Sequence, residues 1–204
     1  MIAIIKYGSG NVGAISNVLK QLKLDHVVTI DKYELQLADK YILPGVGAFD
    51  PTMRNLRESG VIDILNEEVI VGNKKILGIC VGMQIMGDAS DEGTEAGLGW
   101  IPGHIRKIDS NKLPSRPKLP HMGWNSILPM TPSPMFNNVD VNLGFYFLHS
   151  YFFDAQNQSD IVATVKYGQD IPCCVRRGNV CGMQFHPEKS HSNGVAIFRN
   201  FGLL

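Results

Sequence analysis

The sequence has no long hydrophobic run, no excess of either charge and no paired cysteine motif. No stretch approaches the roughly 18 consecutive apolar residues that a membrane-spanning helix requires. The apolar run at residues 2–5 is too short for the core of a signal peptide, and no small-residue cleavage site follows it. We therefore expect a protein of the cytoplasm that does not contact a membrane.

A basic surplus is absent as well, because Lys and Arg together number 19 and so do Asp and Glu. No segment is rich in Lys or Arg, so the sequence does not indicate a nucleic-acid partner. The chain has four cysteines, of which Cys173 and Cys174 are adjacent and cannot easily bond to each other. Without an export signal, we expect reduced thiols rather than disulfides. No C-x-x-C pair occurs, and we expect no metal and no cofactor.

The first half of the chain alternates short apolar runs with segments of helical spacing. At 204 residues and 44% hydrophobic content, the chain is long enough to bury the core of one domain. Alternation of strands with helices favours a parallel sheet with helices on both faces. We predict strands at 1–6, 26–30, 41–43 and 75–79. We predict helices at 12–22 and 51–71, and a further helix whose first residues are 83–88.

The second half changes character, since its apolar runs are joined by turns without clear helices between them. We predict strands at 97–108, 124–128, 145–149, 161–167 and 173–185, and a closing helix at 192–201. Pro114, Pro117 and Pro120 indicate an irregular surface loop at 110–120. No linker divides the chain. The predicted fold is a single α/β domain over residues 1–204, with a central, mostly parallel but mixed sheet flanked by helices and a hairpin-rich second half.

The strongest local signal is Cys80, which has Gly78 and Gly82 two positions away on either side and directly follows an apolar strand. This G-x-C-x-G pattern is a cysteine version of the nucleophile elbow. Glycines on both sides of a sharp strand-to-helix turn remove the Cβ atoms that would clash there. The helix N-terminus would favour a thiolate and could stabilise an oxyanion. A lone cysteine is more often a core residue, but the two glycines favour a nucleophile.

A cysteine nucleophile needs a base, and His186 is the best candidate among the six histidines. It follows an apolar strand, and the carboxyl ends of strands are where open α/β sheets build their sites. Glu188, two residues further on, can face the same side and orient the imidazole. Taken alone, each of these two residues could equally be a surface-loop group without a function.

The segments GICVGMQ at 78–84 and QFHPEKS at 184–190 together resemble the class I, or triad, glutamine amidotransferases. Within that superfamily the chain is similar to the glutaminase subunits of imidazole glycerol phosphate synthase. The resemblance implies a flavodoxin-like class I glutamine amidotransferase fold. The segments that carry it along the rest of the chain are YGSGN at 7–11, LPGVGAF at 43–49, GLG at 97–99, PHMGWN at 120–125 and YFLHSY at 146–151.

The resemblance also implies what individual residues do. Cys80 would attack the side-chain amide of glutamine to give a glutamyl thioester, His186 would protonate the departing ammonia and then activate water, and Glu188 would hold His186. An oxyanion strand, expected to need a peptide reorientation, would comprise Gly45, Val46 and Gly47, joined by the Val81 backbone N–H. The groups expected to hold the glutamine amino and carboxylate groups are Gln84, Glu92, His149, Ser150 and Tyr151.

The implied partner is a synthase subunit of the (β/α)8-barrel type, in a heterodimer. Free ammonia in neutral water is mostly protonated and not nucleophilic, so it must reach its acceptor by a shielded route. The resemblance places Met122, Trp124, Tyr146 and Lys189 at or near the interface, where exposed aromatic residues suit a hot spot. Ordinary core packing is an equal alternative for Met122 and Trp124.

Several functions remain open for the chain, and they differ in whether ammonia is passed on and to which acceptor. The resemblance implies histidine biosynthesis, with imidazole glycerol phosphate and AICAR as products. The segment IMGDASDEG at 85–93 departs from the usual form and resembles paralogues that feed a sugar-amidating enzyme of surface-polysaccharide synthesis. A stand-alone γ-glutamyl cysteine hydrolase could use the same triad without a partner. A non-catalytic regulatory subunit would have a degraded site, whereas here all three triad residues are present.

Overall fold

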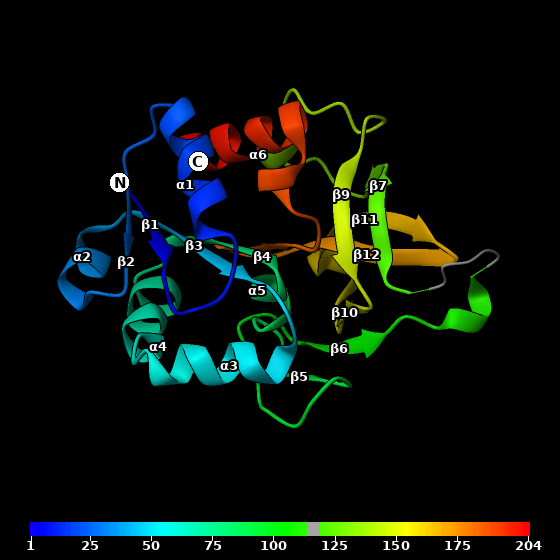
Figure 1. The fold of residues 1–204 in the computed structure, drawn as a ribbon, viewed down its shortest axis with the longest axis horizontal. Helices are drawn as coiled ribbons and strands as arrows, with labels where there is room; N and C mark the ends of the chain where they lie inside the picture. The colour runs from blue at the N-terminus through cyan, green and yellow to red at the C-terminus, as the bar shows by residue number, and fades with distance from the viewer. Residues whose placement is uncertain (114–118) are drawn as a thin grey trace.

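A computed structural model describes residues 1–113 and 119–204 (Figure 1). Residues 114–118, which include Pro114 and Pro117 of the expected loop, lie outside the described residues. The strands are β1 (Ile2–Ile5), β2 (His26–Thr29), β3 (Lys40–Gly45), β4 (Lys75–Cys80), β5 (Ala89–Ser90), β6 (Gly103–Lys107), β7 (His121–Asn125), β8 (Ile127–Pro129), β9 (Phe145–His149), β10 (Tyr151–Ala155), β11 (Ile161–Tyr167), β12 (Gln169–Arg177) and β13 (Val180–Met183).

Eight of these strands form one sheet in the order β2-β1-β3-β4-β13-β12-β11-β8. The first five are parallel to their neighbours, and their order has the 2-1-3-4-5 pattern of flavodoxin-like folds. The last three are antiparallel to their neighbours, and β11, β12 and β13 follow one another as hairpins. The predicted mixed α/β sheet with a hairpin-rich second half is therefore confirmed.

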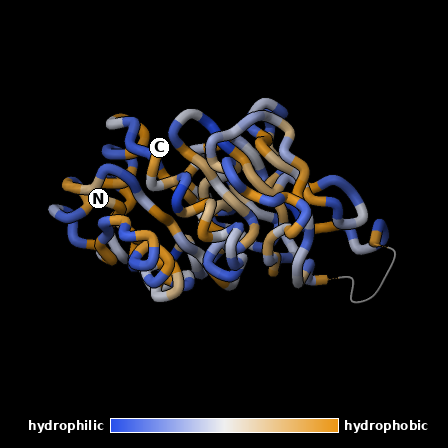
Figure 2. Tube along the Cα trace, turned by 90° about the horizontal axis from the view of Figure 1, so that it is seen from above, coloured by the Kyte–Doolittle hydropathy of each residue, from blue (hydrophilic) through white to orange (hydrophobic). Residues whose placement is uncertain are grey.

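Helices cover both faces of the parallel part of the sheet. They are α1 (Val12–Gln21), α2 (Lys32–Leu37), α3 (Phe49–Glu58), α4 (Ile62–Leu65), α5 (Val81–Gln84) and α6 (His191–Leu203). Figure 1 shows α1 and α6 together on one face and α3 and α4 on the other. Strands β1 and β4 are consequently buried almost throughout, and apolar segments run through the middle of the molecule (Figure 2). No helix in the described residues has the length and apolar character to cross a membrane.

The helix predicted over 51–71 is wrong as a single element. It is divided into α3, α4 and a π-helical segment, η1 (Asn66–Val71), because Gly60 adopts a φ of +68° and ends α3. Helix α2 was not predicted. Its N-terminus carries a recognisable signal, since the Asp31 side chain accepts a hydrogen bond from the Glu34 N–H at 3.0 Å.

The strand predicted over 97–108 is also shorter, because β6 begins only at Gly103. The N–H groups of Leu98, Gly99 and Trp100 instead bond to the carbonyls of the turn that follows α5. Those bonds hold the segment as an irregular strap over the end of α5. Trp100 and Ile101 of this segment are buried, but its backbone is not that of a strand.

Two small sheets complete the second half, β10-β6-β5 and β7-β9. In the second of these, β9 runs beside the turn after β13, where the Tyr146 carbonyl accepts a hydrogen bond from the His186 N–H at 2.9 Å. Short 3-10 segments occur at η2 (Ser110–Lys112), η3 (Pro134–Phe136), η4 (Gln158–Asp160) and η5 (Pro187–Lys189). Strand β9 thereby becomes one wall of the pocket described next.

Candidate active site

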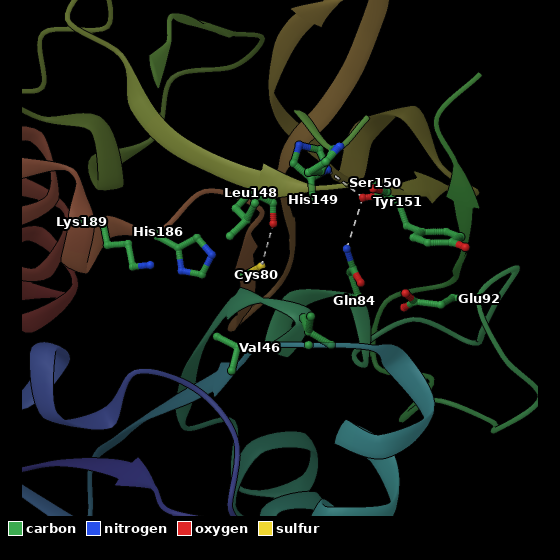
Figure 3. Close-up of a pocket in the computed structure, with 13 residues that line it drawn as sticks. Val46, Cys80, Gln84, Glu92, Leu148, His149, Ser150, Tyr151, His186 and Lys189 are labelled. Atoms are coloured by element: carbon green, nitrogen blue, oxygen red, sulfur yellow. Dashed lines mark hydrogen bonds between the residues drawn. The ribbon is translucent and has the colours of Figure 1, made fainter. Parts of the chain in front are cut away.

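Three parallel strands end side by side at the edge of the sheet where the pocket lies. Gly45 of β3 is in register with Cys80 of β4, and Met183 of β13 is in register with Ile79. Residues that follow these strands are therefore brought together although they are about 35 and 100 positions apart in the chain. The pocket between them and β9 is lined by most of the predicted site residues, namely Val46, Gly47, Cys80, Val81, Gln84, Glu92, His149, Ser150, Tyr151, His186 and Lys189 (Figure 3).

Cys80 has the strained backbone expected of an elbow, with a φ of 55° and a ψ of −115°. A Cβ atom on Gly82 would lie 1.9 Å from the Leu43 carbonyl oxygen, so only glycine allows the turn to approach β3 this closely. The predicted sharp strand-to-helix turn at Cys80 is confirmed by this geometry. The strain holds the Cys80 side chain above the strand ends, facing the pocket.

The helix predicted from 83 to 88 is wrong in its extent, because α5 ends at Gln84 after a single turn. Carbonyls of Ile85, Met86 and Gly87 accept hydrogen bonds from the strap at 98–101 instead of from a following helical turn. A one-turn helix has only a small macrodipole. Support for a thiolate at Cys80 must therefore come mainly from individual side chains.

His186 and Glu188 form a buried pair, with side chains only 3% and 1% exposed and 2.9 Å between His186 Nδ1 and Glu188 Oε1. The second oxygen, Glu188 Oε2, has no hydrogen-bond partner among the described residues. A buried carboxylate with so few partners is stabilised by a cation beside it. Burial by itself lowers the pKa of His186, but Cys80 and Glu188 outweigh burial and raise this pKa to about 10.

The Cys80 sulfur lies between groups of opposite hydrogen-bonding character. Its Sγ is 3.9 Å from the Leu148 carbonyl oxygen, and the Gln184 Nε2 donates to it at 3.7 Å. The His186 ring lies beside the sulfur in the same pocket (Figure 3). A thiol can donate to Leu148, whereas a thiolate can only accept, from Gln184 and from a protonated His186.

In the expected oxyanion strand, the N–H of the middle residue, Val46, points toward Ser9 and not into the pocket. The Val46 N–H donates to Ser9 Oγ at 3.0 Å, and the Ser9 hydroxyl donates back to the Val46 carbonyl at 3.1 Å. Gly47 adopts a φ of +91°, which few residues other than glycine tolerate. Gly45 lies buried beneath Val81 and Gly82, outside the pocket lining. In this conformation the Val46 N–H is therefore unavailable to an oxyanion.

The opposite end of the pocket offers hydrogen-bond acceptors. The Gln84 Nε2 donates both to the Tyr151 carbonyl at 3.2 Å and to Gln184 Oε1 at 3.0 Å, so only its oxygen can face a ligand. The Glu92 carboxylate accepts from the Phe49 N–H at the start of α3. An ammonium group is the natural complement of these acceptors.

A series of hydrogen bonds, all donated in the same direction, runs from Asn125 to the Tyr151 carbonyl at the pocket. The His149 Nδ1–H donates to the Tyr151 carbonyl at 2.8 Å, so His149 Nε2 must accept from His121 Nδ1 at 3.0 Å. The other nitrogen of His121 accepts from Asn125 Nδ2 at 3.2 Å. Burial lowers the pKa of His121 to about 4 and that of His149 to about 3. Both rings are therefore neutral at physiological pH, each in a defined tautomer.

The residues expected at the partner interface lie mostly outside the pocket lining. Met122 and Trp124 on β7 are 61% and 48% exposed, so the core-packing alternative for them is wrong. Trp124 stacks on the His191 ring at 5.2 Å. Lys189 reaches the pocket and holds its Nζ 5.5 Å from the centre of the Tyr146 ring. In the β7-β9 pair, Met122 lies opposite Leu148, which lines the pocket, and Trp124 lies opposite Tyr146.

The family model for class I glutamine amidotransferases matches residues 3–203, nearly the whole chain. The chain belongs to the class I glutamine amidotransferase family. This amidotransferase is accordingly an enzyme of the glutaminase type. Among the described residues, no group of three or more His, Cys, Asp or Glu side chains could hold a metal ion.

Similar proteins cover this amidotransferase from end to end. It is 44% identical to the imidazole glycerol phosphate synthase subunit HisH of Leptospira borgpetersenii over 100% of both chains. It is 45% identical to the subunit of the same name from Bdellovibrio bacteriovorus over 98% of both chains. Among solved structures, PurLQS from Thermotoga maritima shares the fold with a TM-score of 0.71 at 19% identity, covering 98% of this chain and 95% of that one.

Three residues of the site were not predicted from the sequence: Ser9, His121 and Gln184. Gln184 left a usable signal, because it directly follows the strand β13 and stands only two residues before His186. The hydrogen bonds of Ser9 and His121 join residues 37 and 28 positions apart, which no local pattern indicates. These contacts depend on how the strands are arranged.

Proposed function

We propose that this chain is the glutaminase subunit of an imidazole glycerol phosphate synthase and that it passes ammonia to a (β/α)8-barrel synthase subunit. The observation that carries the proposal is the Cys80 elbow facing a buried His186–Glu188 pair in one pocket. Full-length similarity to subunits of that name supports the choice of synthase. We also propose that residues 1–204 act as one domain in the cytoplasm, where Cys80 would remain a free thiol.

In the proposed first step, the Cys80 thiolate attacks the side-chain amide carbon of glutamine. The carbonyl π electrons move to oxygen, and the Val46 and Val81 N–H groups stabilise the oxyanion once the oxyanion strand has turned. The oxyanion then collapses, the C–N bond breaks, and the proton on His186 goes to the leaving nitrogen. The products are ammonia and a glutamyl thioester on Cys80.

In the second step His186, now neutral, takes a proton from water while the water oxygen attacks the thioester carbon. Formation of the thioester removes the sulfur charge, which is one of the interactions that raise the pKa of His186. His186 therefore becomes a better base when a base is needed. Collapse of the second oxyanion expels the Cys80 thiolate and releases glutamate.

Glutamine binding is proposed to use the acceptor end of the pocket. Glu92 and the Gln84 oxygen suit the ammonium group, while the segment His149, Ser150 and Tyr151 holds the carboxylate end. The exposed surface of Met122, Trp124, Tyr146 and Lys189 is proposed to contact the synthase subunit. The barrel would then convert its acceptor to imidazole glycerol phosphate and AICAR.

The test is a glutaminase assay of the chain alone and with the barrel subunit and its acceptor ligand. Activity should be low alone and rise with the partner, and Cys80→Ala should abolish it. Cys181→Ala, which removes a buried thiol outside the pocket, is the matched control. Retention of glutamine hydrolysis by Cys80→Ala would exclude the proposed chemistry.

The alternatives give different results in the same assay. A stand-alone γ-glutamyl hydrolase would prefer a γ-glutamyl peptide to glutamine and would ignore the partner. A chain that serves a sugar-amidating enzyme would not be stimulated by the histidine-pathway barrel. A regulatory subunit would not be labelled at Cys80 by the glutamine analogue diazo-oxo-norleucine.

A further inference from the structure

Gln184 is a fully buried amide whose two ends are both engaged at the reacting centre. It has no exposed surface and directly follows β13. Its Nε2 lies 3.7 Å from Cys80 Sγ, and its Oε1 lies 3.0 Å from Gln84 Nε2. Because Met183 is in register with Ile79, Gln184 stands beside Cys80 at the ends of two neighbouring strands.

The direction of these hydrogen bonds follows from a backbone carbonyl. The Tyr151 carbonyl can only accept, so the end of Gln84 that faces it at 3.2 Å must be the NH2 group. The same NH2 group faces Gln184, which must therefore present its oxygen to Gln84. The remaining end of Gln184, its NH2 group, is left pointing at the sulfur.

A donor at this position matters because, apart from a protonated His186, the other supports of a thiolate are few. Helix α5 has one turn, and the Leu148 carbonyl oxygen near the sulfur disfavours a negative charge there. A hydrogen bond donated to a charged acceptor is stronger than one donated to a neutral acceptor. A thioester sulfur is a weak acceptor, so the Gln184 donor stabilises the attacking and departing thiolate more than the acylated state.

We propose that Gln184 is a further catalytic residue, whose side-chain NH2 group donates to Cys80 Sγ and favours the thiolate, and that Gln84 is the positioning residue that orients it. The proposal rests on the proposed function of Cys80 as the nucleophile. It gives Gln84 a second task besides its expected contact with glutamine. That task is present before any substrate binds.

The experiment measures the rate of Cys80 alkylation by iodoacetamide against pH in the chain without glutamine, with the modified peptide identified by mass spectrometry. In Gln184→Met the midpoint of the profile should rise by about one pH unit, which is a roughly tenfold loss of thiolate on the acid side. Gln184→Glu, nearly the same shape but with a carboxylate facing the sulfur, should shift it further. Gln84→Met should shift it in the same direction by less.

Gln21→Met is the matched control, since Gln21 is exposed at the end of α1, far along the chain from the pocket residues. Circular dichroism verifies that each variant is folded. A profile of Gln184→Met that coincides with that of the control overturns the proposal. Should Gln184→Met not fold, Gln84→Met decides, because without this partner the Gln184 amide is no longer oriented toward the sulfur. Failure of the proposed function would show separately, as glutamine hydrolysis by Cys80→Ala.

Discussion

Ser9 is predicted to hold the oxyanion strand in its resting orientation, and Ser9→Ala should release it. The hydroxyl accepts from the Val46 N–H at 3.0 Å. Turning the peptide between Gly45 and Val46 toward Cys80 breaks this hydrogen bond. The second bond, from the hydroxyl to the Val46 carbonyl at 3.1 Å, belongs to the next peptide and need not break.

The size of the effect follows from one hydrogen bond. Such a bond contributes about 0.5–1.5 kcal/mol net, because water replaces part of it when it is lost. Val46 is 45% exposed, so water can reach its N–H in the variant. Removing the hydroxyl should therefore raise the population of the turned strand, and the activity without a partner, roughly two- to twelvefold.

The assay is steady-state glutamine hydrolysis without the synthase subunit, at saturating glutamine. Ser59→Ala is the matched control, because it removes a hydroxyl that bonds to the Leu56 carbonyl at the end of α3 and does not line the pocket. The increase should appear in kcat and should shrink when the synthase subunit is added. Equal or lower activity in a folded Ser9→Ala chain would refute the reasoning.

Three further predictions concern the triad, the buried histidines and the exposed surface. Glu188→Gln should lower the pKa of His186 from about 10, measured by NMR titration of the imidazole, and an unchanged value would contradict the pairing. An unfolded histidine binds a proton near pH 6.5, whereas folded His121 and His149 do so only near pH 4 and pH 3. The free energy of unfolding in urea should therefore fall as the pH drops from 6.5 to 4. The fall should be less steep in His121→Phe. Trp124→Ala should weaken binding of the synthase subunit about thirtyfold in calorimetry, as loss of a hot-spot residue of about 2 kcal/mol would, and an unchanged affinity would place the interface elsewhere.

The single direction of hydrogen bonding from Asn125 through His121 and His149 has a structural consequence. It connects β7, whose Met122 and Trp124 side chains are exposed, to the backbone carbonyl of Tyr151 in the pocket. The two neutral rings cannot exchange their donor and acceptor nitrogens unless every hydrogen bond in the series is broken. The geometry of the pocket wall is thus tied to the position of β7.

The sequence by itself determined the elements whose signals are local. Apolar runs placed β1, β4 and β11 within a residue or two, and the spacing of Gly78, Cys80 and Gly82 indicated the elbow. The pair of His186 and Glu188 was also readable, because only one residue separates them in the chain and the contact is local. These features depend on near neighbours in the chain, so a pattern of a few residues is sufficient to specify them.

Only the tertiary structure decided the rest. The short length of α5 depends on hydrogen bonds from the strap at 98–101, and the resting orientation of Val46 depends on Ser9, 37 positions away. The donor that Gln184 presents to Cys80 exists because β13 pairs with β4 across about 100 residues of chain. The direction of that hydrogen bond is set in turn by the Tyr151 carbonyl on another element. Such contacts follow from strand order and register, which bring distant residues within hydrogen-bonding range without a trace in local sequence.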